Sequence, residues 1–267
     1  MNGEDWRSLL TDATKEVQNR VSKVVEQGEV SKVVEVGASG DTTLVADKEA
    51  ENELFKALTP LDGLRIISEE AGNWGDPHAP LVAIVDPLDG SSNFERRIPF
   101  YCTSVAVAKG DSLAGISWAL IRNLVNGDVY WAEKGKGSFK NGIRLTGSKR
   151  ASLRDVVLDV DFSRGPPELV AKLARLVTSV KRQVHIGANA LELCFVAEGC
   201  VDSFVDMRGR MRMTDFAAGY LIAREAGAEV TAWDGSPLEL PVRLETKISF
   251  VASGSRRIHA DVLDLCR

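Results

Sequence analysis

Apolar positions recur at helical spacing near the start of the chain. Leucine, alanine and valine occupy every third or fourth position between Trp6 and Val25, and Gly28 follows as a terminator. The small polar stretch Val36–Asp41 predicts a loop, and helical spacing resumes over Asp47–Leu58. The pattern therefore predicts two helices separated by a loop.

Short apolar runs bounded by polar residues then predict strands. Leu64–Ile67 and Leu81–Val85 are two such runs, and each ends just before a group of carboxylates. Further apolar segments alternate with glycine and asparagine turns, which predicts antiparallel strands at Ser104–Ala108, Ala114–Trp118 and Val129–Ala132. Residues 1–150 are thus expected to form a strand-rich α+β half.

A boundary is predicted near Gly147–Leu153, and residues 151–267 are expected to form a second half with alternating helices and strands. The predicted strands are Val156–Val160, Arg182–Ile186, Val201–Val205 and Glu229–Ala232. The predicted helices are Pro167–Thr178, Asn189–Ala197, Asp215–Ala226 and His259–Cys266.

Composition narrows the classes of partner. The chain has 267 residues, of which 44% are hydrophobic, enough for a sizeable core. Its 33 basic and 38 acidic residues give a net charge of -5 without long single-sign blocks, which argues against nucleic acid as a partner. Apolar runs are too short to span a membrane and the N-terminus is polar, so we expect a cytoplasmic protein. Four cysteines without a C-x-x-C pair and three scattered histidines argue against zinc or disulfide frameworks.

The segment from Asp86 to Asn93, Asp-Pro-Leu-Asp-Gly-Ser-Ser-Asn, is the sharpest local feature. Two carboxylates, Asp86 and Asp89, lie on a proline-stiffened turn after a strand and can face one point. Mg²⁺ prefers such oxygen ligands, and the carbonyl of Leu88 can supply another. The residues from Gly90 onward could begin a helix whose free N–H groups receive a phosphate.

Each carboxylate has an ordinary structural interpretation when taken alone. Asp-Pro-Leu-Asp-Gly is rich in common turn residues, Glu69 and Glu70 could be a solvated pair, and Asp215 could simply cap a helix. Their combination with Asp47 and the phosphate-ready turn favours a shared site.

Several motifs, in order, resemble the inositol monophosphatase superfamily, and most closely its archaeal-type members with both inositol monophosphatase and fructose 1,6-bisphosphatase activity. Asp86–Phe94 is similar to the family's Asp-Pro-x-Asp-Gly-Thr/Ser-x-Asn-Phe, and Thr214–Gly219 to its Trp-Asp-x-Ala-Ala-Gly. Lys134–Gly137 with Asn141 and Gly142, and Gly187–Ala188, agree as well. The resemblance covers nearly the whole chain. It implies an α+β fold, a layered αβαβα sandwich with the active site between the halves, and a homodimer.

The resemblance also implies roles for individual residues. One Mg²⁺, or Mn²⁺ in its place, would be held by Glu69, Asp86 and the carbonyl of Leu88, and a second by Asp86, Asp89 and Asp215. Asp47 would act as the base through Ser91. Physically this is a two-metal displacement, in which one cation lowers the pKa of the attacking water and the other stabilises the leaving alkoxide.

The sequence departs from the family pattern at a few positions. Ser68, Thr214 and Ser91 replace a glycine, a tryptophan and a threonine, and none of these changes removes a ligand or a hydroxyl. Arg208, Arg210 and Arg212 stand where inositol-specific relatives place a hydroxyl-binding glutamate. They form either a solvated basic face or a phosphate clamp, chiefly Arg208, because arginine suits bidentate phosphate recognition.

The expected function is therefore Mg²⁺-dependent hydrolysis of a small phosphorylated sugar or polyol, either fructose 1,6-bisphosphate or inositol monophosphate. The substrate would contact Asp89, Gly90, Ser91, Gly187, Ala188, Asn189 and Arg208. Two alternatives stay open at this point. One is a 3′-phosphoadenosine 5′-phosphate phosphatase of the same fold, although aromatic residues make up only 6% of the chain. The other is a sugar-phosphate-binding relative without catalysis.

Overall fold

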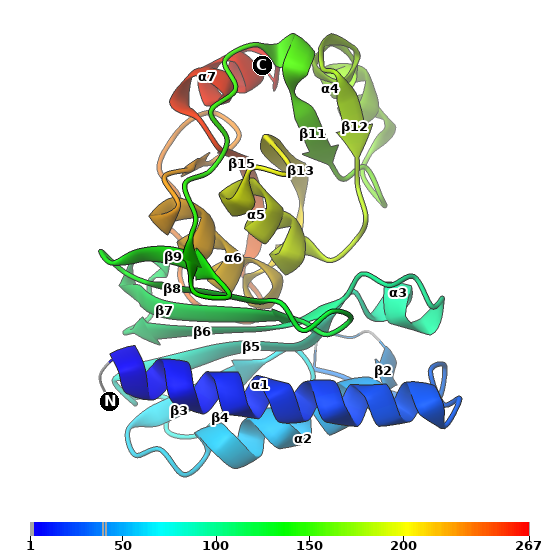
Figure 1. The fold of residues 1–267 in the computed structure, drawn as a ribbon, viewed down its shortest axis with the longest axis vertical. Helices are drawn as coiled ribbons and strands as arrows, with labels where there is room; N and C mark the ends of the chain where they lie inside the picture. Colours follow the sequence, from blue (N-terminus) through cyan, green and yellow to red (C-terminus); the bar gives the residue numbers. More distant parts are fainter. Residues whose placement is uncertain (1–2, 39, 41, 267) are drawn as a thin grey trace.

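The computed structural model describes residues 3–38, 40 and 42–266. Helices and sheets alternate in five layers (Figure 1). The helices are α1 (Gly3–Glu26), α2 (Val45–Leu58), α3 (Ser91–Glu95), α4 (Pro167–Ser179), α5 (Asn189–Glu198), α6 (Met213–Glu225) and α7 (Arg256–Cys266). None of those in the described ranges is long and apolar enough to cross a membrane.

The larger sheet has eight strands in the order β10-β9-β8-β7-β6-β5-β3-β4. All of its strands come from residues before 150: β3 (Leu64–Ser68), β4 (Gly72–Trp74), β5 (Leu81–Asp89), β6 (Cys102–Lys109), β7 (Ile116–Asn123), β8 (Val129–Glu133), β9 (Gly137–Lys140) and β10 (Ile143–Arg144). Only the pair β3 and β5 is parallel. Their carboxyl ends therefore meet at one edge of the sheet, where Ser68 lies opposite Val85.

The smaller sheet has five strands in the order β12-β11-β13-β15-β14, all from residues after 150. They are β11 (Val157–Val160), β12 (Arg182–Val184), β13 (Ser203–Arg212), β14 (Glu229–Thr231) and β15 (Lys247–Ser253). A separate two-stranded ribbon, β1 (Val33–Val36) with β2 (Thr42–Leu44), flanks the predicted loop, of which residues 39 and 41 lie outside the described residues.

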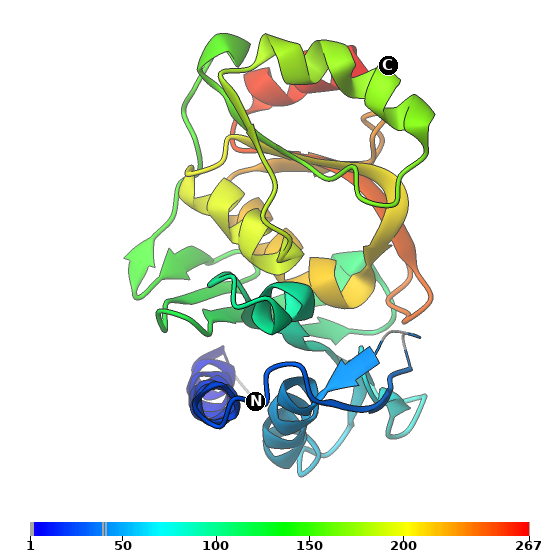
Figure 2. The ribbon, with the colours of Figure 1, turned by 90° about the vertical axis from the view of Figure 1, so that its right-hand side faces the viewer.

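Three apolar clusters hold the layers together. The first packs α1 and α2 against one face of the larger sheet, with Leu10, Val17 and Leu54 fully buried. The second surrounds α5 and α6, which lie between the two sheets (Figures 1 and 2). The third packs α4 and α7 against the outer face of the smaller sheet. This order of layers confirms the predicted αβαβα sandwich.

Most of the predicted helices and strands are present, but several bounds differ and some strands were not predicted. The predicted strand Ala114–Trp118 begins only at Ile116, because Ser112 accepts a hydrogen bond from the backbone N–H of Ala114 and caps a short 3₁₀ turn over Leu113–Gly115. The sequence analysis also missed β15, which is held in place by partners distant in sequence, β13 and β14.

Candidate metal centre and active site

The last four residues of β5 form one side of the site. The register between β5 and β6 shifts between Asp86 and Asp89, so Pro87 and Leu88 have no partner in the ladder. The Leu88 backbone N–H donates to Asp86 Oδ1 at 3.1 Å, and Thr103 Oγ1 donates to the carbonyl of Pro87 at 2.8 Å. These bonds fix the bulge, and both carboxylates in it are buried.

A second strand end and a helix start complete a carboxylate cluster with Asp86. Glu69 follows β3 directly, and its backbone N–H donates to the carbonyl of Val85 at 3.1 Å. Asp215 lies in the first turn of α6. Glu69, Asp86 and Asp215 each offer an oxygen, and these three atoms lie within 4.8 Å of one another. The structure thus brings three predicted ligands from distant segments to one point.

Electrostatics at this point favour a bound cation. Burial raises the pKa of Asp86 well above its usual value, and the charges of Glu69, Asp89 and Asp215 raise it further. Burial likewise raises the pKa of Glu69, with the Asp215 charge as the next cause. One arginine, Arg212, forms an ion pair with Glu69. A hard divalent cation fits this donor set, since the cluster offers only oxygens and its side chains repel one another without one.

Asp89 is held by the start of α5. Its carboxylate accepts the backbone N–H groups of Asn189 at 3.2 Å and Ala190 at 2.7 Å. Burial raises the pKa of Asp89 to about 7, and the charge of Asp215 contributes in the same direction. The predicted substrate residues at the α5 start therefore lie beside a predicted metal ligand.

Gly90 permits the start of α3 to lie close to the start of α5. Its φ is +90°, and a Cβ there would lie 3.0 Å from the carbonyl oxygen of Phe100 and 3.1 Å from Cβ of Ala188. Any other residue would strain the backbone and separate the starts of α3 and α5. Asn93 Nδ2 donates to the carbonyl of Ile186 at 2.8 Å and ties the same two segments together.

Asp47 is buried in the first turn of α2. Its Oδ2 accepts the backbone N–H of Leu44 at 2.6 Å. Burial raises the pKa of Asp47 to about 7 despite this hydrogen bond, and the Asp47 charge in turn acts on Glu69. Ser91, the first residue of α3, is half-buried. Within the described residues no hydrogen bond joins Asp47 to Ser91, so their relay stays a prediction.

The three arginines of β13 diverge. Gly209 has a φ of +65°, and the register of β13 against β15 shifts between Asp206 and Met211. Arg210 is consequently exposed, whereas Arg212 reaches Glu69. Sequence reasoning favoured Arg208 and undervalued Arg212, whose signal was its place three residues before Asp215.

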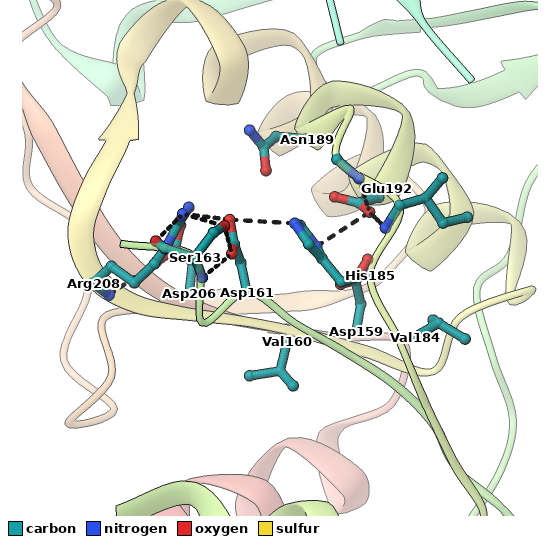
Figure 3. Close-up of polar contacts among 12 residues, drawn as sticks. Asp159, Val160, Asp161, Ser163, Val184, His185, Asn189, Glu192, Asp206 and Arg208 are labelled. Atoms are coloured by element: carbon teal, nitrogen blue, oxygen red, sulfur yellow. Dashed lines mark hydrogen bonds and ion pairs between the residues drawn. The ribbon is translucent and has the colours of Figure 1, made fainter. Parts of the chain in front are cut away.

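Arg208 is already bound to two carboxylates. Its Nε and one terminal nitrogen donate to Asp206 at 3.0 and 2.6 Å, and the other terminal nitrogen pairs with Asp161 and donates to the carbonyl of Ser163 at 3.1 Å (Figure 3). Burial lowers the pKa of Arg208, but these partners and the charge of Asp215 raise it overall. Its role as a phosphate clamp stays a prediction.

The two departures that adjoin predicted metal ligands have local partners. Ser68 Oγ donates to Glu51 Oε1 at 2.6 Å, and the same oxygen accepts the backbone N–H of Ala71 at 2.9 Å. Thr214 Oγ1 donates to Asp215 Oδ1 at 2.9 Å. Both hydroxyls therefore order the segments that carry Glu69 and Asp215.

Comparison with known proteins gives one consistent result. The sequence pattern of the inositol monophosphatase family matches residues 6–266. A fructose-1,6-bisphosphatase/inositol-1-monophosphatase from Methanothermobacter thermautotrophicus is 32% identical over 97% of this chain and 95% of its own length. A bifunctional NADP phosphatase/NAD kinase from Methanococcus maripaludis is 29% identical over 93% of this chain, which covers 47% of that protein. A Pyrococcus horikoshii protein described as similar to inositol-1 monophosphatase has a solved structure that matches all of both chains with a TM-score of 0.86 and 30% identity.

Proposed function

Because the chain belongs to the inositol monophosphatase family and is a phosphoric monoester hydrolase, we propose that it is a Mg²⁺-dependent phosphatase that hydrolyses fructose 1,6-bisphosphate, inositol monophosphate or both. Mn²⁺ is expected to substitute for Mg²⁺. The observation that carries the proposal is the cluster of buried Asp86 with the partly buried Glu69 and Asp215, whose oxygens lie within 4.8 Å of one another.

Two cation sites are proposed at the end of β5. Glu69, Asp86 and the carbonyl of Leu88 would hold one cation, and Asp86, Asp89 and Asp215 the other. Divalent cations bound there would lower the pKa of water and neutralise the phosphoryl oxygens. The support is a donor set of carboxylate oxygens, raised pKa values at Glu69 and Asp86, and an Arg212 ion pair that offsets only part of the negative charge.

Asp47 is the proposed proton acceptor, acting through the hydroxyl of Ser91. A general base works best when its pKa lies near the working pH, and burial brings the pKa of Asp47 to about 7. The Leu44 N–H fixes the orientation of its carboxylate. Asp47 would thus take the proton that the attacking water loses.

The substrate is proposed to lie across the starts of α3 and α5, in contact with Asp89, Gly90, Ser91, Gly187, Ala188 and Asn189. The close approach of Gly90 to Ala188 supports this placement. Arg208 would bind a second phosphate. Because Asp206 and Asp161 already neutralise its guanidinium, that phosphate would have to share the arginine with them.

A second candidate substrate class is a phosphorylated nucleotide. The chain matches about half of the length of bifunctional NADP phosphatase/NAD kinases, so the phosphate monoester of NADP is a candidate substrate, with the sugar alkoxide as the leaving group. 3′-Phosphoadenosine 5′-phosphate belongs to the same class.

Phosphate release over a panel tests the proposal. The panel contains fructose 1,6-bisphosphate, inositol 1-phosphate, NADP⁺ and 3′-phosphoadenosine 5′-phosphate, each with Mg²⁺ and with a chelator. The first two should be hydrolysed fastest and only with metal. A preference for the nucleotides would favour the second candidate. The homodimer in the proposal rests on the family resemblance, and the cytoplasmic location rests on apolar runs too short to span a membrane. Sedimentation in solution tests the dimer.

A further inference from the structure

A second ionic cluster lies beside the turn between β12 and α5. His185, which follows β12, stands between three carboxylates (Figure 3). Its Nδ1 lies 3.1 Å from Asp159 Oδ1 and 3.3 Å from Glu192 Oε1, and its Nε2 lies 3.3 Å from Asp161 Oδ2. Because both ring nitrogens face carboxylate oxygens, an imidazolium, which donates from both nitrogens, satisfies all three contacts.

The charges around this ring favour the imidazolium. Asp159 and Glu192 are each 1% exposed, and one oxygen of each, Asp159 Oδ2 and Glu192 Oε2, has no hydrogen-bond partner. Uncompensated buried carboxylates are costly. The next cation, Arg208, is already bound to Asp161 and Asp206. His185 is therefore the cation that balances Asp159 and Glu192.

The groups that face His185 come from three elements. Asp159 lies on β11 and Asp161 follows that strand, Glu192 lies on α5, and β13 contributes the ring of Phe204 at 6.5 Å. Burial lowers the pKa of His185, but its hydrogen bonds to Asp159 and Asp161 and the charge of Glu192 raise it to about 10. The imidazolium thus persists through neutral pH.

Glu192 connects this cluster to the turn before α5. Its Oε1 accepts the backbone N–H groups of Ile186 at 2.6 Å and Gly187 at 3.0 Å. Two residues further on, Asn189 donates its backbone N–H to Asp89. The turn that Glu192 fixes is therefore the turn that orients a proposed metal ligand.

We propose that His185 is a positioning residue for the reaction: its imidazolium fixes Glu192 and Asp159, and through them the β12–α5 turn that holds the carboxylate of Asp89. The inference rests on the proposed function of the Asp89 site. Loss of the positive charge at His185 would leave Glu192 next to Asp159 without a cation and loosen the turn. The expected effect is on metal affinity and turnover, with little change in KM.

The test compares His185→Gln, which removes the charge, with His185→Arg, which retains it. At pH 7.5, His185→Gln should lower kcat and weaken Mg²⁺ binding, each by roughly tenfold, the usual scale for residues that orient metal ligands. His185→Arg should stay within about threefold of wild type, because a bidentate cation still pairs with the carboxylates. Equal losses in both variants would overturn the proposal.

A charge-compensating double variant guards against a trivial folding defect. Glu192→Gln keeps an oxygen for the Ile186 and Gly187 N–H groups but removes a negative charge, so His185→Gln/Glu192→Gln should recover most of the Mg²⁺ affinity that His185→Gln loses. Additive losses would overturn the proposal. His259→Gln is the matched control, because His259 is a buried histidine bound to Thr231 and Ser253, away from this cluster.

Two further measurements keep the outcome independent of the phosphatase assay. Mg²⁺ affinity measured by calorimetry needs no substrate, so failure to hydrolyse any ester bears on the proposed function alone. Nitrogen NMR of His185 at pH 8 should show both ring nitrogens protonated. Since Asp159, His185 and Glu192 could also hold a metal ion, a stoichiometric transition metal that is lost in His185→Gln would replace the imidazolium and overturn the proposal.

Discussion

Replacing Asp86 by asparagine should make the metal-free protein more stable and the metal-loaded protein less so than wild type. Asp86 is 1% exposed and lies within 4.8 Å of oxygens of Glu69 and Asp215. Two unit charges at that separation repel by about 3 kcal/mol at an effective dielectric constant of about 20. Asparagine keeps the size and the oxygen that accepts the Leu88 N–H, but carries no charge.

The net gain in the metal-free variant should be smaller than the bare repulsion, since protonation and Arg212 already relieve part of it. We expect about 1–2 kcal/mol, or roughly 2–8 °C in Tm at about 2–4 °C per kcal/mol for a chain of this size. Wild type should gain about 2.7 kcal/mol from Mg²⁺ at about 100 times its Kd, and the variant almost none.

Urea and thermal unfolding in a chelator and in excess Mg²⁺, with phosphate release measured on the same samples, check this prediction. The order of stability should invert between the two conditions, and the variant should release phosphate at under about a tenth of the wild-type rate, because an amide does not neutralise a cation. A variant less stable than wild type in chelator, or one with the full Mg²⁺ shift, would refute the assignment of Asp86 as a metal ligand.

Three other experiments have defined outcomes. Asp47→Asn and Ser91→Ala should each lower kcat by about 10²–10⁴-fold, with the double variant no worse than the worse single one in steady-state assays; multiplied losses would mean separate roles. Arg208→Ala should lower kcat/KM for fructose 1,6-bisphosphate relative to inositol 1-phosphate, which corresponds to a loss of about 1.5–3 kcal/mol of transition-state stabilisation. The substitution Arg210→Ala, at an exposed position, should leave the ratio of the two kcat/KM values unchanged. The stability that His185 contributes should be full below pH 6.5 and lost progressively up to pH about 10, because its folded-state pKa is raised from 6.5 to about 10; urea unfolding should show no such loss in His185→Arg.

The fold was largely predictable because its signals are local. Helical spacing predicts α1, and apolar runs that end at carboxylates predict β3 and β5. β15 was not predictable in the same way, because its pairing with β13 and β14 depends on segments that are distant in sequence. Whether residues 1–150 and 151–267 act as separate units stays a prediction.

The residues of the site that lie in short sequence motifs were predictable. Glu69, Asp86 and Asp215 were expected to converge and do so. The directions of the arginine side chains were not predictable. Strict strand alternation would place Arg208 and Arg212 on one face, but the irregularity at Gly209 separates them.

The His185 cluster had no local signal. Asp159 lies 26 residues before His185, and the two meet because β11 and β12 pair in parallel with Asp159 opposite Val184. Only the sheet register brings the histidine to this carboxylate, so a count of scattered histidines could not reveal it.

The most direct test of the central claim is a titration of metal-free protein with Mg²⁺, in which phosphate release from fructose 1,6-bisphosphate and inositol 1-phosphate is measured beside Mg²⁺ binding. We expect no release without metal, release that rises as Mg²⁺ binds, and loss of both binding and release in Asp215→Asn. Release at full rate in chelator, or unchanged Mg²⁺ binding in Asp215→Asn, would contradict the claim.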